Sequence, residues 1–125
     1  MKAFREAVEA RDSAAVEALL ADDVVFISPV AFTPYRGRPI TAAILRGVLR
    51  VFEDFRYTRE ITGDRDHVLI FEATVNGKAI TGCDILRLND DGLIGEFMVM
   101  VRPLSAAQAL AEAMAAQFDQ IKSES

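Results

Sequence analysis

The sequence has little of several residue types on which common kinds of protein depend. Among its 125 residues there are one cysteine, one histidine and no tryptophan. A lone cysteine, Cys83, cannot form a disulfide within the chain, so a reducing compartment is the simpler expectation. A transition-metal centre usually draws on several histidine and cysteine side chains, and the chain has only one of each. We therefore expect neither a metal nor another cofactor.

Positive charge and long apolar runs are also scarce. The chain has 14 Lys and Arg residues against 19 Asp and Glu residues, a net charge of −5. Binding to nucleic acid requires a basic face, so a nucleic-acid partner is not expected. No apolar run approaches the roughly 18 residues of a membrane span. Residues 1–6 carry charges where a secretory signal would be apolar. We expect a cytoplasmic protein without membrane association.

The remaining composition is that of a globular chain. Hydrophobic residues make up 51% of the sequence and charged residues 26%. A chain of this length can bury about two thirds of its unfolded surface and is expected to form a single domain, residues 1–125. Within that domain, residues 1–104 are predicted to form the core, and residues 105–122 a closing C-terminal helix.

Apolar residues at helical spacing predict two helices at the start of the chain and one in its middle. The expected inner faces carry Phe4, Ala7 and Val8, then Val16, Leu19 and Leu20, then Ile44, Val48, Val51 and Phe52. Asp12 can cap the second helix, and Pro39 suits the first turn of the third. Between these helices, residues 24–27 are β-branched or aromatic and predict a short strand, and the proline-rich residues 28–39 predict a loop.

The final helix has its own signals. Ser105 with Gln108 three residues later predicts a capping box at its start. Its inner face is expected to carry Leu110, Met114, Phe118 and Ile121.

From Phe55 onward the hydrophobic period changes from 3.6 to 2, which predicts a sheet. In the first strand Phe55, Tyr57, Arg59 and Ile61 are expected to share one face. Further strands are predicted over 67–75, 78–88 and 93–102, and the overall class is α+β. Asn76-Gly77 between two of these strands is a strong signal for a two-residue hairpin turn.

This turn predicts which side chains share a face. If Asn76 and Gly77 are the two turn residues, Val75 pairs with Lys78, and cross-strand partners lie on one side. One face then carries Leu69, Phe71, Ala73, Ile80, Gly82, Asp84, Leu86 and Leu88. Asp84 is the single carboxylate in this apolar set. A β-bulge between the turn and Asp84 would reverse the assignment.

The opposite face is mixed, with Ile70, Cys83, Ile85, Met98 and Met100 among polar residues. A sheet face that is neither covered nor fully polar often becomes a subunit contact, so we expect a homodimer through this face. An ion pair between Arg87 and Glu96 is expected there.

Three stretches carry a family resemblance: Gly37-Arg38-Pro39-Ile40 at a helix start, residues 82–88 (GCDILRL), and residues 91–96 (DGLIGE). In this order the chain resembles the SnoaL-like branch of the nuclear transport factor 2-like superfamily over residues 1–104. The resemblance implies a cone-shaped, curved antiparallel sheet wrapped around the N-terminal helices, an apolar pocket, and commonly a dimer through the sheet. The superfamily includes isomerases, cyclases, hydrolases, dehydratases and binding domains, so the resemblance alone does not select an activity.

The resemblance also implies a site. Asp84 matches the position at which similar cyclases carry an acid/base aspartate, and burial would raise its pKa toward neutrality. Tyr57 is the candidate hydrogen-bond donor to a developing oxyanion, with Tyr35 as the other phenol. The pocket is expected to be lined by Tyr35, Phe55, Leu69, Phe71 and Leu86. The alternative is that Asp84 only braces the fold and that Tyr57 has its hydroxyl at the surface.

Two functions remain open from the sequence. The first is a cofactor-free isomerase, cyclase or hydrolase that acts on a small hydrophobic carbonyl compound or epoxide. The second is a non-catalytic domain that binds a small apolar ligand or mediates dimerisation. No second inward acid is evident, although Arg59 could reach the pocket. His67 is expected at an exposed strand end, Cys83 in a packing role, and Arg36 and Arg38 as solvated charges.

Overall fold

Each amphipathic helix and strand buries its apolar face, and these buried faces together form one hydrophobic core. The computed structural model describes all residues, 1–125. The helices are α1 (Lys2–Glu9), α2 (Ser13–Ala18), α3 (Arg38–Val51) and α4 (Leu104–Glu124). The strands are β1 (Leu20–Ile27), β2 (Tyr35–Arg36), β3 (Glu53–Thr62), β4 (Asp66–Val75), β5 (Lys78–Leu88) and β6 (Ile94–Arg102). No helix has both the length and the apolar composition needed to cross a membrane.

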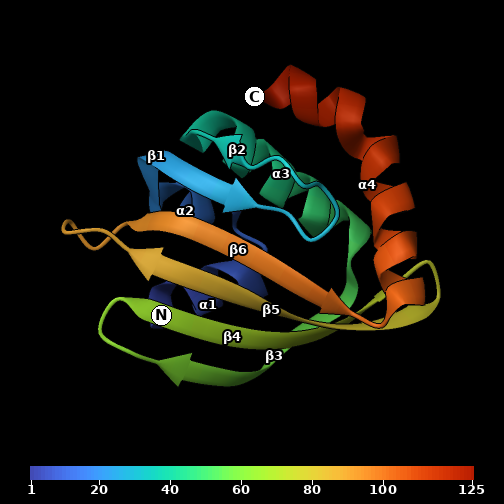
Figure 1. Cartoon of the computed structure of the whole chain (residues 1–125), viewed down its shortest axis with the longest axis horizontal. Helices are drawn as coiled ribbons and strands as arrows, with labels where there is room; N and C mark the ends of the chain where they lie inside the picture. Colours follow the sequence, from blue (N-terminus) through green and yellow to red (C-terminus); the bar gives the residue numbers. More distant parts are fainter.

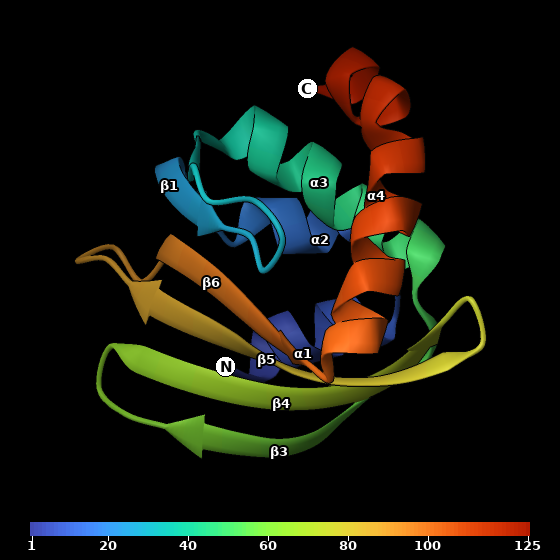
Figure 2. The same cartoon turned by 45° about the vertical axis from the view of Figure 1, so that its right-hand side comes forward.

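The six strands form one curved sheet in the order β2-β1-β6-β5-β4-β3 (Figure 1). The sheet bends around α1, while α2 and α3 lie over its other half and α4 runs from the end of β6 toward α3 (Figure 2). This is the predicted cone. The pairing of β1 with β6 is parallel, whereas a fully antiparallel sheet was expected. These two strands are distant in the sequence, and no local turn signal reports how they pair.

The hairpin between β4 and β5 has the predicted register. Asn76 and Gly77 have φ angles of 49° and 80°, as a tight two-residue turn requires. Val75 pairs with Lys78, and the pairing continues without a shift to Asp66 and Arg87. No bulge therefore intervenes before Asp84, and Asp84 lies on the inner face.

Strand β3 departs from the predicted alternation. Its register against β4 shifts between Tyr57 and Arg59, which is a β-bulge. A bulge adds one residue to one strand, so the side chains beyond it change face. Tyr57 lies inside as predicted, but Arg59 and Ile61 lie on the outer face, and Glu60 takes the inner position opposite Leu69. The expectation that Arg59 could reach the pocket is wrong.

Helix ends follow the sequence in part. The Asp12 side chain accepts a hydrogen bond from the Ala15 N–H at 3.1 Å, so the predicted cap of α2 is confirmed. Leu20 lies beyond that helix and begins β1 as a fully buried residue. The predicted capping box of α4 is wrong, because the helix begins one residue earlier, at Leu104, and Ser105 is already within its first turn.

Two further expectations, both for residues near strand ends, are wrong. His67 is buried, 6% exposed, because β4 begins at Asp66 and places His67 on the inner face opposite Leu86. Arg87 and Glu96 are register partners on the outer face, but they make no ion pair. Their backbones are held side by side by the ladder, and the two charged ends remain free.

Candidate functional site

A cavity of about 310 Å³ lies between the concave side of the sheet and the helices. Of its 25 lining residues, 22 are hydrophobic. The walls come from both halves of the chain: for example Phe4 from α1, Phe26 from β1, Val48 from α3, Phe97 from β6 and Met114 from α4. The volume is that of a small-molecule site, and the lining favours an apolar occupant.

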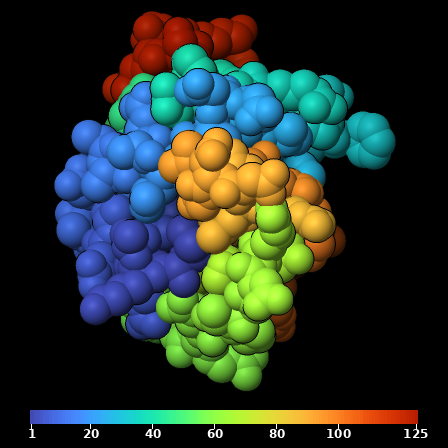
Figure 3. Space-filling view, turned by 90° about the vertical axis from the view of Figure 1, so that its left-hand side faces the viewer, coloured from blue at the N-terminus to red at the C-terminus, as the bar shows by residue number.

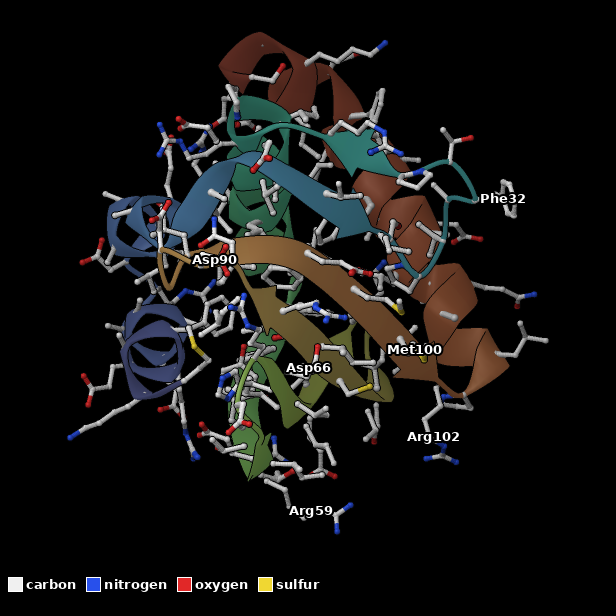
Figure 4. All side chains as sticks on the ribbon, turned by 60° about the vertical axis from the view of Figure 1, so that its left-hand side comes forward. Phe32, Arg59, Asp66, Asp90, Met100 and Arg102 are labelled. Atoms are coloured by element: carbon white, nitrogen blue, oxygen red, sulfur yellow. The ribbon has the colours of Figure 1, made fainter.

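Aromatic side chains dominate this lining. Nine of the ten aromatic residues of the chain line the cavity: Phe4, Phe26, Tyr35, Phe52, Phe55, Tyr57, Phe71, Phe97 and Phe118. The tenth, Phe32, is fully exposed in the loop between β1 and β2. That loop projects from the body of the molecule (Figures 3 and 4).

Asp84 is the one ionisable carboxylate that lines the cavity, and it has a single side-chain partner. The Tyr57 hydroxyl donates a hydrogen bond to Asp84 Oδ2 at 2.6 Å. Two local features create this contact. The Asn76-Gly77 turn sets the register that turns Asp84 inward, and the bulge of β3 comes just after Tyr57, so that Tyr57 still faces inward.

Burial changes the acidity of both groups. The loss of solvent raises the pKa of Asp84 to about 7, and the hydrogen bond from Tyr57 limits that rise. The pKa of Tyr57 is raised well above its ordinary value, first by burial and then by the Asp84 charge. Near neutral pH, Asp84 is therefore divided between its acid and base forms, while Tyr57 remains a hydrogen-bond donor.

The residues predicted for the pocket separate into two groups. Tyr35, Phe55 and Phe71 line the cavity together with Asp84 and Tyr57. Leu69 and Leu86 do not line it. Both are completely buried, because the core packing closes around them on the same inner face.

Helix α4 supplies a wall that was not assigned to the pocket from the sequence. Leu110, Met114, Phe118 and Ile121, predicted as its inner face, all line the cavity, and so do Ala111 and Ala115. The sequence pattern of apolar residues at helical spacing predicted this inner face. Such a pattern does not show whether the face packs against a solid core or lines a cavity.

Two arginines of α3 hold the end of α4 in place. Arg46 Nε lies 3.0 Å from Glu124 Oε2, and Arg50 Nη2 lies 3.0 Å from Glu124 Oε1. Arg50 Nε also donates to Gln117 Oε1 at 2.7 Å. Gly47, between these arginines, allows the close approach, because a Cβ there would lie 2.9 Å from Ile121 Cδ1.

The other candidates lie away from the cavity. Arg38 pairs with Asp22 at 2.8 Å, and Arg36 is exposed. Cys83 is half-buried on the outer face, where loss of solvent raises the pKa of its thiol. A raised pKa keeps a thiol protonated, so a packing role for Cys83 remains the better interpretation.

A curved α+β sheet around a cavity is the fold that this chain shares with solved nuclear transport factor 2-like proteins. The SnoaL-like domain family matches residues 1–97, and the chain belongs to that family. No curated protein sequence is similar enough to count as a match.

Solved structures agree with this assignment. A steroid delta-isomerase from Pseudomonas aeruginosa is 41% identical, with a TM-score of 0.90 over 96% of this chain and 89% of that one. An uncharacterised protein with a cystatin-like fold from Silicibacter pomeroyi DSS-3 is 34% identical, with a TM-score of 0.89 over 98% and 92% of the two chains. A nuclear transport factor 2-like protein of unknown function from Mesorhizobium loti is 19% identical, with a TM-score of 0.72 over 82% and 88%, and shares the fold.

Proposed function

We propose that this protein is a cofactor-free isomerase that moves a proton within a small hydrophobic carbonyl compound. The observation that carries the proposal is the Tyr57–Asp84 hydrogen bond of 2.6 Å at the wall of an otherwise apolar cavity. The 41% identity to a protein described as a steroid delta-isomerase supports the same reaction class. A β,γ-unsaturated ketone, including a steroid ketone, is the substrate type that follows.

In this reaction Asp84 is the proton carrier. Its carboxylate takes the proton from the carbon between the carbonyl and the double bond, and the electron pair delocalises onto the carbonyl oxygen. The protonated Asp84 then returns the proton to the far carbon of the original double bond. All atoms are retained and nothing is oxidised or reduced. An acid with a pKa of about 7 suits both halves of this transfer.

Tyr57 is the hydrogen-bond donor for the negative charge that develops on the substrate oxygen. Its hydroxyl donates to Asp84 in the structure. Transfer of this donor to the substrate oxygen would stabilise the enolate and free the carboxylate for proton abstraction. A donor in such a position typically contributes about 10²–10³-fold to kcat. The apolar lining strengthens this interaction because it excludes water.

The test is conversion of a β,γ-unsaturated steroid ketone to its conjugated isomer, followed by ultraviolet absorbance across pH. We expect kcat/KM to rise with pH around a midpoint near 7, as Asp84 ionises. Asp84→Asn should abolish turnover while a non-reacting product analogue still binds. Asp91→Asn, the same replacement at an exposed turn, is the matched control and should keep full activity.

Tyr57→Phe separates the two roles. It should lower kcat by about 10²–10³-fold. It should also move the pH midpoint upward, because the hydrogen bond from Tyr57 lowers the pKa of Asp84. A wild-type protein that binds such ketones but does not convert them would instead support the binding-domain alternative. Unchanged activity in Asp84→Asn would contradict the proposed mechanism.

A further inference from the structure

The cavity combines many aromatic rings with one negative group and no positive one. Nine aromatic side chains line it, and Asp84 is its only carboxylate. None of the 25 lining residues is a lysine, an arginine or a histidine. The face of an aromatic ring carries partial negative charge and attracts cations within about 6 Å of its centre. The lining therefore offers an organic cation both apolar contact and electrostatic attraction.

The rings beside Asp84 stand at steep angles to one another. Tyr57 is nearly perpendicular to Phe55, at 87° with centroids 5.0 Å apart, and to Phe71, at 84° with centroids 6.5 Å apart. Phe55 and Phe71 are stacked, with centroids 5.0 Å apart. All three rings line the cavity. Because Tyr57 is perpendicular to the other two rings, the aromatic surface around Asp84 is not confined to one plane.

Asp84 also lacks a positive partner within the protein. Its one side-chain hydrogen bond comes from the neutral Tyr57 hydroxyl, and the residue as a whole is 7% exposed. A buried carboxylate without a counter-ion is costly, and a neutral ligand leaves that cost in place. A cationic ligand removes it by supplying the missing charge.

We propose that the cavity is a binding site for hydrophobic organic cations, with a quaternary or protonated amine lying between the aromatic rings and the Asp84 carboxylate. Such ligands would occupy the same space as a carbonyl substrate and compete with it. The proposal concerns binding alone and does not require the isomerase activity.

The pH dependence of this binding follows from the groups that face Asp84. Tyr57 of β3 is the titratable group that hydrogen-bonds to it. Arg5 and Glu9 of α1 act on Tyr57, with opposite signs. Tyr35 is the other titratable residue of the lining. His67 of β4 and Glu60 of β3 lie on the same inner face as Asp84 but outside the lining. Since the pKa of Asp84 is about 7, binding of a permanent cation should tighten about tenfold between pH 6 and pH 8.

The experiment compares benzyltrimethylammonium with neopentylbenzene, which has the same shape without the charge. Calorimetric titration of the cation at pH 6 and pH 8 gives its Kd, and the rise in melting temperature compares both compounds at equal concentration. We expect the cation to bind about tenfold more tightly at pH 8 than at pH 6. The neutral compound should raise the melting temperature less at pH 8 and show no tightening with pH.

Two variants separate the carboxylate from the rings. Asp84→Asn keeps the shape of the cavity and should weaken cation binding at least tenfold and remove its pH dependence. Phe55→Leu should weaken binding of the cation more than binding of the neutral compound, and the pH dependence of cation binding should remain. The proposal is overturned if the cation binds no better than neopentylbenzene at pH 8, or binds Asp84→Asn as well as wild type. Neither result bears on turnover of ketones, so the isomerase proposal stands or fails separately.

Discussion

At the scale of single residues, Asp84 is placed where its charged form is unfavourable. The unfolded chain gives this carboxyl its ordinary pKa of 3.8, whereas burial raises the pKa to about 7 in the folded protein. Below about pH 4 the Asp84 carboxyl is protonated in both the folded and the unfolded state, so it does not lower the free energy of unfolding. Between about pH 4 and pH 7 the unfolded state ionises first, and stability falls. The resulting loss in the free energy of unfolding levels off above pH 7 at about 4 kcal/mol.

Asp84→Asn should remove this penalty. We expect the variant to be more stable than wild type at pH 8 by up to about 4 kcal/mol and nearly equal to it at pH 4. Asparagine can still accept the hydrogen bond from Tyr57, so packing should change little. Urea unfolding at several pH values measures the difference, and other carboxyl groups cancel because both proteins contain them. A difference that does not grow with pH would refute the raised pKa.

At the scale of elements, the β4–β5 hairpin positions the site, and Gly82 allows it to do so. A Cβ at Gly82 would lie 2.4 Å from Phe71 Cζ and 2.7 Å from the Met100 carbonyl oxygen. The Phe71 ring therefore lies across β5 at the inner position next to Asp84. Only a residue without a side chain leaves room for the ring there.

Gly82→Ala should therefore destabilise the protein by about 1–3 kcal/mol and disturb the cavity wall. Gly95→Ala is a matched control in β6, because its Cβ would have only ordinary contacts, at 3.7 Å and 3.8 Å. Thermal unfolding of the two variants compares them directly. Equal stability of both variants would show that the Phe71 ring moves aside without cost.

The elements also show how far the sequence could be interpreted. The Asn76-Gly77 turn determines the β4–β5 register through local backbone geometry, so the inward position of Asp84 could be predicted. The same register pairs His67 with Leu86 on the inner face, so the burial of His67 was also within reach of the sequence. The bulge after Tyr57 was not, because it depends on how β3 meets β4. The Tyr57–Asp84 contact joins strands without a sequence signal that links the two side chains, and only the folded sheet brings them together.

At the scale of the whole molecule, the outer face of the sheet has the features of a contact surface. Register partners place an apolar row of Ile27, Met98, Ile85, Val68 and Ile61 beside a second row of Met100, Cys83 and Ile70. The charged residues of this face that make no ion pair within the chain include Arg59, Asp66, Arg87, Glu96 and Arg102. Arg59, Asp66, Met100 and Arg102 are labelled in Figure 4.

We propose that a second copy of the chain covers this face. A twofold axis parallel to the strands, between β5 and β6, would bring Glu96 against Arg87 of the partner subunit and join the two apolar rows. Light scattering should therefore give the mass of a dimer. Met100→Glu should produce monomers, since Met100 is 53% exposed in the single chain and its replacement need not disturb the fold. Phe32→Glu, at an exposed loop, should remain dimeric. A wild-type monomer would refute the proposal.

The parallel pairing of β1 with β6 has a consequence for how the protein is made. Its partners are far apart along the chain: Phe26, for example, pairs with Phe97, and both line the cavity together with the still later α4. Contacts of such long range carry a large loop-closure cost, which slows folding. The cavity is complete only when β1, β6 and α4 have come together. During synthesis no ligand can stabilise the nascent chain through this site until β6 and α4 have emerged. Ligand occupancy thus reports only molecules that have completed folding.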